Sequence, residues 1–165
     1  KGLDQRRDPH RILEVVNGLE ADVVALQEAD MRLGMRPSAL PRRMIEHETD
    51  FNIVEIAAND VSLGWHGIAL LARPHLQASA VHRYPLPGLE PRGAVGLDLE
   101  NIRIVAVHLG LLRSYRQKQL HAIRAALALR KRFDLHQCGL VQRLGWVVRI
   151  DQLHRFFICV HCSQI

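Results

Sequence analysis

The sequence predicts an α/β fold in which helices cover layered sheets. A capped amphipathic helix near the start is followed at once by a short, wholly apolar run, as in a strand buried on both faces. Two later apolar runs flank a two-residue polar turn, and a long amphipathic helix follows them. The 165 residues, 48% hydrophobic and 24% charged, match one ordinary globular domain and exclude a disordered or fibrous chain.

The first expected element is a helix that begins after Asp8. An aspartate in that position is a good N-cap, Pro9 suits the first helical position, and Gly18 lies near the end. One face of this helix is apolar, with Ile12, Val15, Val16 and Leu19.

The next segment, residues 21–28, predicts a buried strand with polar residues at its carboxyl end. Four successive apolar residues, 23–26, precede Gln27 and Glu28. Open α/β sheets place their ligands at the carboxyl ends of strands, so both side chains are candidates for a site.

The middle of the chain predicts a loop, a short helix and three strands. Residues 31–41 form the loop, and the helix passes through Met44. Strands are expected at 51–56 and 68–73, and the weakly alternating residues 77–84 are expected to pair beside the second of these.

Residues 93–99 and 102–108 predict an antiparallel hairpin, because only Glu100 and Asn101 separate them. A helix is expected from about 115 to 132. Its apolar stripe consists of Leu120, Ile123 and Leu127. No apolar run approaches the ~18 residues that a membrane span requires.

All three cysteines, Cys138, Cys159 and Cys162, lie late in the chain. An odd, uneven set argues against a disulfide framework and favours a reducing, cytoplasmic compartment. Cys159, His161 and Cys162 have side chains of the types that bind zinc. A single Cys-x-x-Cys pair without a second pair is, however, more often explained by packing of the tail.

The formal net charge of +5 is compatible with anionic partners. Basic residues on the helix from Tyr115 are candidates to meet nucleic-acid phosphates. A solvated helix face is the commoner interpretation, and aromatic residues, at 5%, are too few for a base-stacking platform.

Three residues are candidates for chemistry. Glu28, at a strand end, suits a hard cation such as Mg²⁺. His108, also at a strand end, is a candidate general acid or donor to a phosphoryl oxygen, and His66 is a candidate substrate contact in a loop. Taken alone, a glutamate placed like Glu28 is more often a solvated cap and a histidine placed like His108 a structural one. For His66, a hydrogen-bonded loop histidine is an equally good interpretation.

Taken in order, these segments resemble the endonuclease/exonuclease/phosphatase superfamily of deoxyribonuclease-like and exonuclease III-like metal-dependent phosphodiesterases. The resemblance covers residues 2 to about 132. It is carried by Ala21–Glu28, Gly64–Leu71, Glu90–Val95, Val105–Gly110, Arg116 and Gln119–Leu120.

The resemblance implies specific roles at matching positions. Glu28 matches a glutamate that binds Mg²⁺ or Mn²⁺, His108 a catalytic residue that contacts the scissile phosphate, and Arg92 a phosphate-facing arginine. With His66, Arg92 is a candidate to bind substrate phosphate. The substrate, a phosphate ester, stays open among nucleic acid, sphingolipid and inositol phosphate, because fold alone does not fix it.

The implied fold is a layered sandwich of two mixed sheets. Residues 1–132 would supply about half of it, as a partial domain, and residues 133–165 an atypical tail. An uncovered sheet surface would favour a homodimer.

Family motifs are missing from these 165 residues. The glycine-aspartate-phenylalanine-asparagine strand and the aspartate-histidine pair do not occur, and Ile68 stands where close relatives carry asparagine. We therefore expect an apparently truncated member with weak or no activity. The alternative is a non-catalytic binding module on the same scaffold.

One explanation of the atypical tail is a frameshift. The codons of residues 141–145, read one nucleotide later, can encode Phe-Asn-Asp-Trp, which is close to the missing motif. Under this hypothesis an unrelated sequence replaces the second half of the fold.

Overall fold

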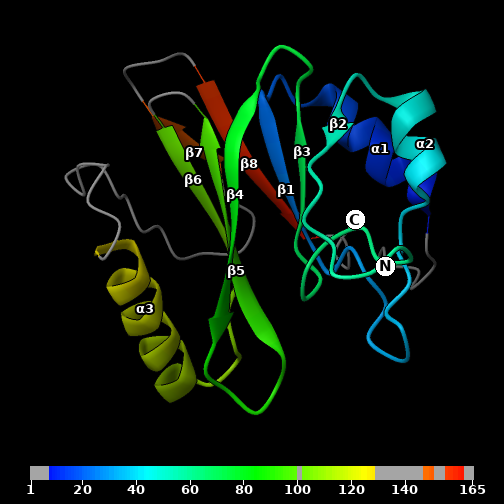
Figure 1. Ribbon diagram of the computed structural model, residues 1–165. Helices are drawn as coiled ribbons and strands as arrows, with labels where there is room; N and C mark the ends of the chain where they lie inside the picture. The colour runs from blue at the N-terminus through cyan, green and yellow to red at the C-terminus, as the bar shows by residue number, and fades with distance from the viewer. Residues whose placement is uncertain (1–7, 100–101, 129–146, 151–154, 162–165) are drawn as a thin grey trace.

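The computed structural model describes residues 8–99, 102–128, 147–150 and 155–161, and these form two sheets with three helices (Figure 1). The first sheet has the order β2 (Asn52–Ile53), β3 (Ala69–Ala72), β1 (Val23–Gln27), β8 (Arg155–His161) and β7 (Val147–Ile150). The second has the order β4 (Ala78–Leu86), β5 (Arg92–Leu99) and β6 (Ile102–His108). The helices are α1 (Pro9–Gly18), α2 (Arg42–Glu48) and α3 (Arg113–Ala128).

Strand β1 is buried on both faces, as its apolar run predicts. Val24 and Leu26 pack in a core with α1 and α2, whereas Val23 and Ala25 pack in a second core with residues of β5. Because successive side chains of a strand point to opposite faces, β1 belongs to both cores at once. Its carboxyl end is therefore held from both sides.

The first two helices cover one face of the five-stranded sheet. At the start of α1, the Asp8 side chain accepts a 3.1 Å hydrogen bond from the Arg11 amide, and Pro9 occupies the first turn, which confirms the predicted cap. Helix α2 buries Ile45 in the same core.

The hairpin of β5 and β6 is also confirmed, and its register matters for the site. Gly93 pairs with His108 at one end and Leu99 with Ile102 at the other. Helix α3 packs on the outer face through Ile123, against Tyr84 and Ala94. It begins at Arg113, two residues before the predicted start.

Two expectations for the strands are wrong. Strand β4 pairs with β5 in the second sheet, not beside β3, because the short 87–91 connection folds it directly back onto β5. The predicted strand at 51–56 is reduced to β2, although the Val54 amide still donates to Leu70. The alternation of apolar and polar residues alone did not define the partner strand of β4 or the length of β2.

Strands β7 and β8 fall in the predicted tail. β8 pairs with β1 in parallel and β7 pairs with β8 in antiparallel, which makes the first sheet mixed. Cys138 and Cys162 lie outside the described residues, so the zinc hypothesis is not tested. In the described ranges, no helix has the length and apolar character needed to cross a membrane.

Candidate functional site

The ends of β1 and β6, from different sheets, are joined by one side chain. Nε2 of Gln27 donates a 2.6 Å hydrogen bond to the backbone carbonyl of Val107. Glu28 and His108 are the next residues along the two strands. The bond therefore brings together the two strand ends, one from each sheet, that carry the predicted site residues.

Glu28 leaves the strand in an unusual backbone conformation. Its φ is +55°, which is uncommon for a residue with a side chain, and its carboxylate accepts from Nη2 of Arg32 at 3.1 Å. Its backbone lies against Gly67, where a Cβ would be 3.6 Å from the Glu28 Cα. Such strain clusters at functional sites, since the surrounding structure must hold it.

His66 comes to the same edge from the loop before β3. It also has a positive φ, +50°, and its ring lies 4.2 Å from that of Trp65. Both rings stand against Gly93 of β5: a Cβ there would lie 2.4 Å from the Trp65 ring and 3.1 Å from that of His66. A glycine at the start of β5 is thus required for the loop to reach the second sheet.

Arg36 approaches His66 from the loop after β1. Its Nη1 lies 3.4 Å from Nδ1 of His66, and its φ is +56°. Burial, followed by the charge of Arg36, lowers the pKa of His66 below its ordinary value. Because a guanidinium only donates, Nδ1 accepts, and the neutral ring carries its proton on Nε2.

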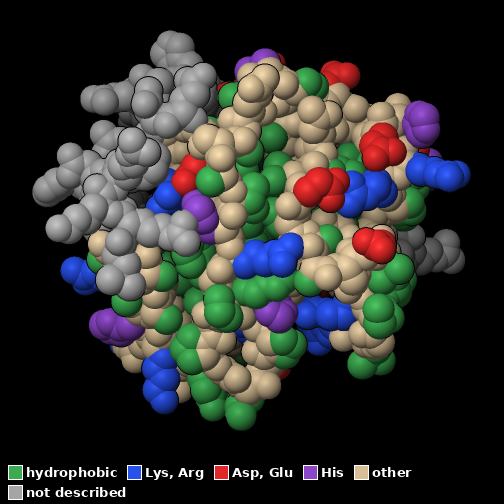
Figure 2. Space-filling model, in the orientation of Figure 1, with side chains coloured by type: hydrophobic (Ala, Val, Ile, Leu, Met, Phe, Trp, Pro, Cys, Tyr) green, Lys and Arg blue, Asp and Glu red, His purple; other side chains and the backbone are tan. Residues whose placement is uncertain are grey.

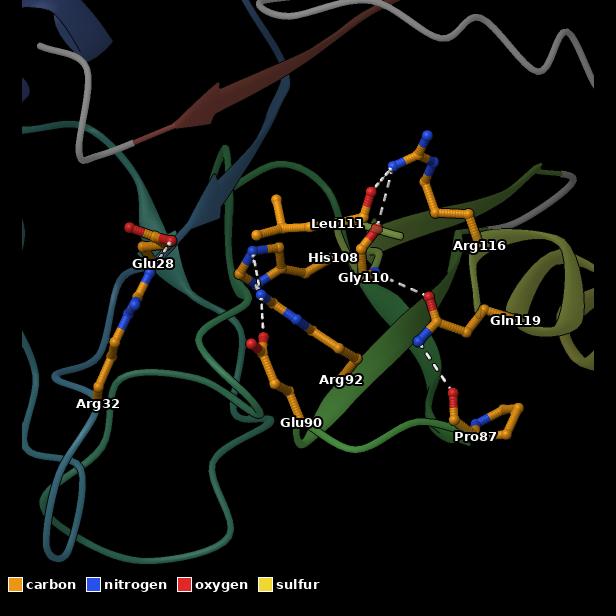
Figure 3. A network of polar contacts seen from close by, with 10 residues as sticks. All are labelled: Glu28, Arg32, Pro87, Glu90, Arg92, His108, Gly110, Leu111, Arg116 and Gln119. Carbon is orange, nitrogen blue, oxygen red and sulfur yellow. Dashed lines mark hydrogen bonds and ion pairs between the residues drawn. The ribbon is translucent and has the colours of Figure 1, made fainter. Parts of the chain in front are cut away.

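Arg92 and His108 form the centre of the polar cluster in Figure 3. Nη1 of Arg92 lies 2.5 Å from Nε2 of His108, and Nη2 donates to Glu90 at 2.6 Å. The Arg92 side chain is only 11% exposed, and its Nε is buried with no hydrogen-bond partner among the described residues. A buried donor without an acceptor costs folding free energy.

A buried glutamine fixes the loops on this side. The Gln119 side chain accepts from the Gly110 amide at 2.8 Å and donates to the Pro87 carbonyl at 3.0 Å (Figure 3). It is 1% exposed. This clamp holds the loop after His108 against the turn that precedes Arg92.

The described residues supply one carboxylate for a metal ion and do not complete a site. Glu28 is paired with Arg32, and the neighbouring Asp30 is buried and accepts from the Leu63 amide at 2.7 Å. Burial raises the pKa of Asp30 above its ordinary value. Within the described ranges, no three His, Cys, Asp or Glu side chains form a metal-binding group. A single glutamate still suits Mg²⁺, which is usually held by one or two carboxylates with water and phosphate.

The four predicted residues, Glu28, His66, Arg92 and His108, thus lie where the ends of β1, β5 and β6 and the loop before β3 meet. Sequence patterns did not identify Arg36, because its position depends on a positive φ and on a loop contact. The bridging role of Gln27 was also missed, although its place at a strand end was a signal.

Comparison with known proteins gives a family match. The model of the Endonuclease/Exonuclease/phosphatase family matches residues 2–152, most of the chain. Neither the curated proteins nor the solved structures include a significant match.

Proposed function

The chain belongs to the endonuclease/exonuclease/phosphatase family, and on that premise we propose that its described residues form the phosphate-binding edge of a metal-dependent phosphoric ester hydrolase. The observation that carries this proposal is the contact between Arg92 and His108, with Glu28 on the adjoining strand end. Substrates of this chemistry include nucleic acids.

Arg92 is proposed to bind the phosphate. Its guanidinium is nearly buried, it keeps an unsatisfied Nε–H, and a guanidinium matches the geometry of a phosphate group. His108, whose ring lies against Nη1 of Arg92, is proposed to contact the same phosphate beside the guanidinium. His66, with its proton on Nε2, is proposed as a second neutral donor.

Glu28 is the residue proposed to hold the Mg²⁺ or Mn²⁺ ion. The ion, when bound, would polarise the phosphoryl oxygen and offset the charge that develops on it. Arg32 must then release the carboxylate. The Arg32 side chain is 79% exposed, so it can move into solvent when it does so.

We propose that the 165-residue chain hydrolyses phosphate esters weakly or not at all. Its described site contains one carboxylate available to a metal, and the sequence lacks the aspartate-histidine pair that would activate water. The pairing of Arg92 with Glu90 favours the alternative, a binding module, because it keeps the arginine ordered without a ligand.

The test is hydrolysis of bis(4-nitrophenyl) phosphate with Mg²⁺ or Mn²⁺. Any turnover should fall by about a hundredfold or more in Glu28→Gln and in His108→Ala. Glu55→Gln and His75→Ala are matched controls that should retain it, because both residues are exposed and lie outside the site. Saturable binding without turnover would support the binding module. Turnover that survives both site variants would contradict the proposal.

The boundary at residue 132 and the frameshifted tail remain predictions. Sequencing of the gene tests both. If no shifted frame continues into an aspartate-histidine ending, the frameshift hypothesis is wrong.

A homodimer also remains a prediction. Light scattering at high protein concentration tests it, and a strictly monomeric species would contradict it.

A further inference from the structure

The most exposed large apolar side chains in the described part of the chain lie in three loops. Leu33 (85% exposed) and Met35 (68%) follow β1, Leu89 (87%) is in the turn between β4 and β5, and Leu111 (80%) and Leu112 (61%) precede α3. Outside β7 and β8, all other large apolar side chains in the described residues are less than half exposed. We call these five residues the apolar rim.

The three loops that carry the apolar rim are connected to the site. The Gln119 clamp joins the loop of Leu111 to the turn of Leu89. The loop of Leu33 is tied to the site through Arg36, which contacts His66. In Figure 1 the three loops lie toward the lower end of the molecule, where Figure 2 shows apolar side chains at the surface.

Cationic side chains accompany the rim. Five arginines lie in or beside the three loops: Arg32, Arg36, Arg113 and Arg116 are at least partly exposed, whereas Arg92 is nearly buried. Glu28 and Glu90 are each paired with one of these arginines, and exposed Asp60 follows Asn59, which donates to the Met35 carbonyl. The arginines outnumber these carboxylates. The surroundings of the rim are therefore positively charged.

We infer that the apolar rim docks on an anionic lipid bilayer. Exposed leucine and methionine side chains can enter the boundary between headgroups and acyl chains, while arginines bind anionic headgroups. A nucleic acid would satisfy the arginines but offers nothing to leucines, and the rim has no aromatic residue on which bases stack. The inference does not rest on the proposed function, because docking requires no turnover.

The test is sedimentation of the full chain with vesicles at physiological salt. One set is phosphatidylcholine and the other contains about one-third phosphatidylserine. We expect the parent chain to sediment with the second set of vesicles. The triple variant Leu89→Ser/Leu111→Ser/Leu112→Ser preserves every charge, and we expect the sedimented fraction of this variant to be about tenfold smaller. The control Val15→Ser/Val81→Ser changes two exposed valines outside the rim and should bind like the parent chain.

Three results would overturn the inference. The first is no sedimentation with anionic vesicles, and the second is equal sedimentation of the triple variant, which would leave charge as the only cause. The third is a dimer that the triple variant abolishes in light scattering, since the rim would then be an interface between copies of the chain. Circular dichroism verifies that each variant is folded.

Discussion

The side-chain amide of Gln27 donates to the backbone carbonyl of Val107 across 2.6 Å, and this bond links the two sheets where the site residues lie. The two strands are 80 positions apart in sequence. The relative position of Glu28 and His108 therefore depends on a long-range contact. This contact is the structural basis of the candidate site.

Removal of that contact should destabilise the fold. Gln27→Ala loses a partly buried hydrogen bond and leaves the Val107 carbonyl without this donor, which should cost about 1–2 kcal/mol of unfolding free energy. Urea denaturation measures the change. Gln77→Ala, an exposed position, should stay close to the parent, and an equal loss in both variants would contradict a specific role for Gln27.

The Gln119 clamp should matter more, because the side chain is fully buried and bonds two loops. Gln119→Ala should lose about 2–3 kcal/mol. The control is Gln117→Ala, two residues away on the exposed face of α3, which should change stability by less than about 0.5 kcal/mol. Similar unfolding midpoints for the two variants would argue against the clamp.

Gly93 should not tolerate a side chain. In Gly93→Ala the new Cβ would clash with the Trp65 ring, and overpacking of this kind costs about 1–3 kcal/mol. Gly18→Ala is the matched control, because nothing lies within 4 Å of its Cβ position. Thermal unfolding should separate the two, and a stable Gly93→Ala would show that the Trp65 loop can move.

Asp98 should contribute stability that is lost in acid. Its carboxylate accepts from Arg103 and from Nε2 of His82 at 2.9 Å, and these contacts, with Arg103 first, hold its pKa below the ordinary value. A depressed pKa stabilises the fold above the unfolded-state value of about 4, and the contribution disappears as pH falls through the folded-state pKa.

The variant Asp98→Asn should therefore flatten the decline of unfolding free energy between about pH 5 and 2. Exposed Asp60→Asn serves as the control and should retain the decline of the parent. The measurement is denaturation across this pH range. An unchanged slope in Asp98→Asn would contradict the assignment.

Local signals in the sequence predicted a large part of the fold. The cap at Asp8, the apolar run of β1 and the antiparallel pairing of β5 with β6 are each decided by neighbouring residues, and all are present. The partner of β4 was missed because strand pairing depends on which edge is available, and alternation does not encode that.

In the candidate site, too, residues with a local signature were predicted and residues placed by long-range contacts were not. Glu28 and His108 were identified because a strand end has a local signature. Arg36 was not, since its contact with His66 depends on a left-handed backbone and on loops 30 positions apart. The roles of the four predicted residues stay predictions until a ligand is tested.

The most direct test of the central claim, that these strand ends bind phosphate, is a titration with inorganic phosphate followed by NMR of ¹⁵N-labelled histidine. We predict that the signals of His66 and His108 shift together and saturate, while those of exposed His75 and His121 do not. Arg92→Gln should raise the apparent Kd for phosphate by at least about tenfold. No shift at His108, or a Kd unchanged by Arg92→Gln, would contradict the account.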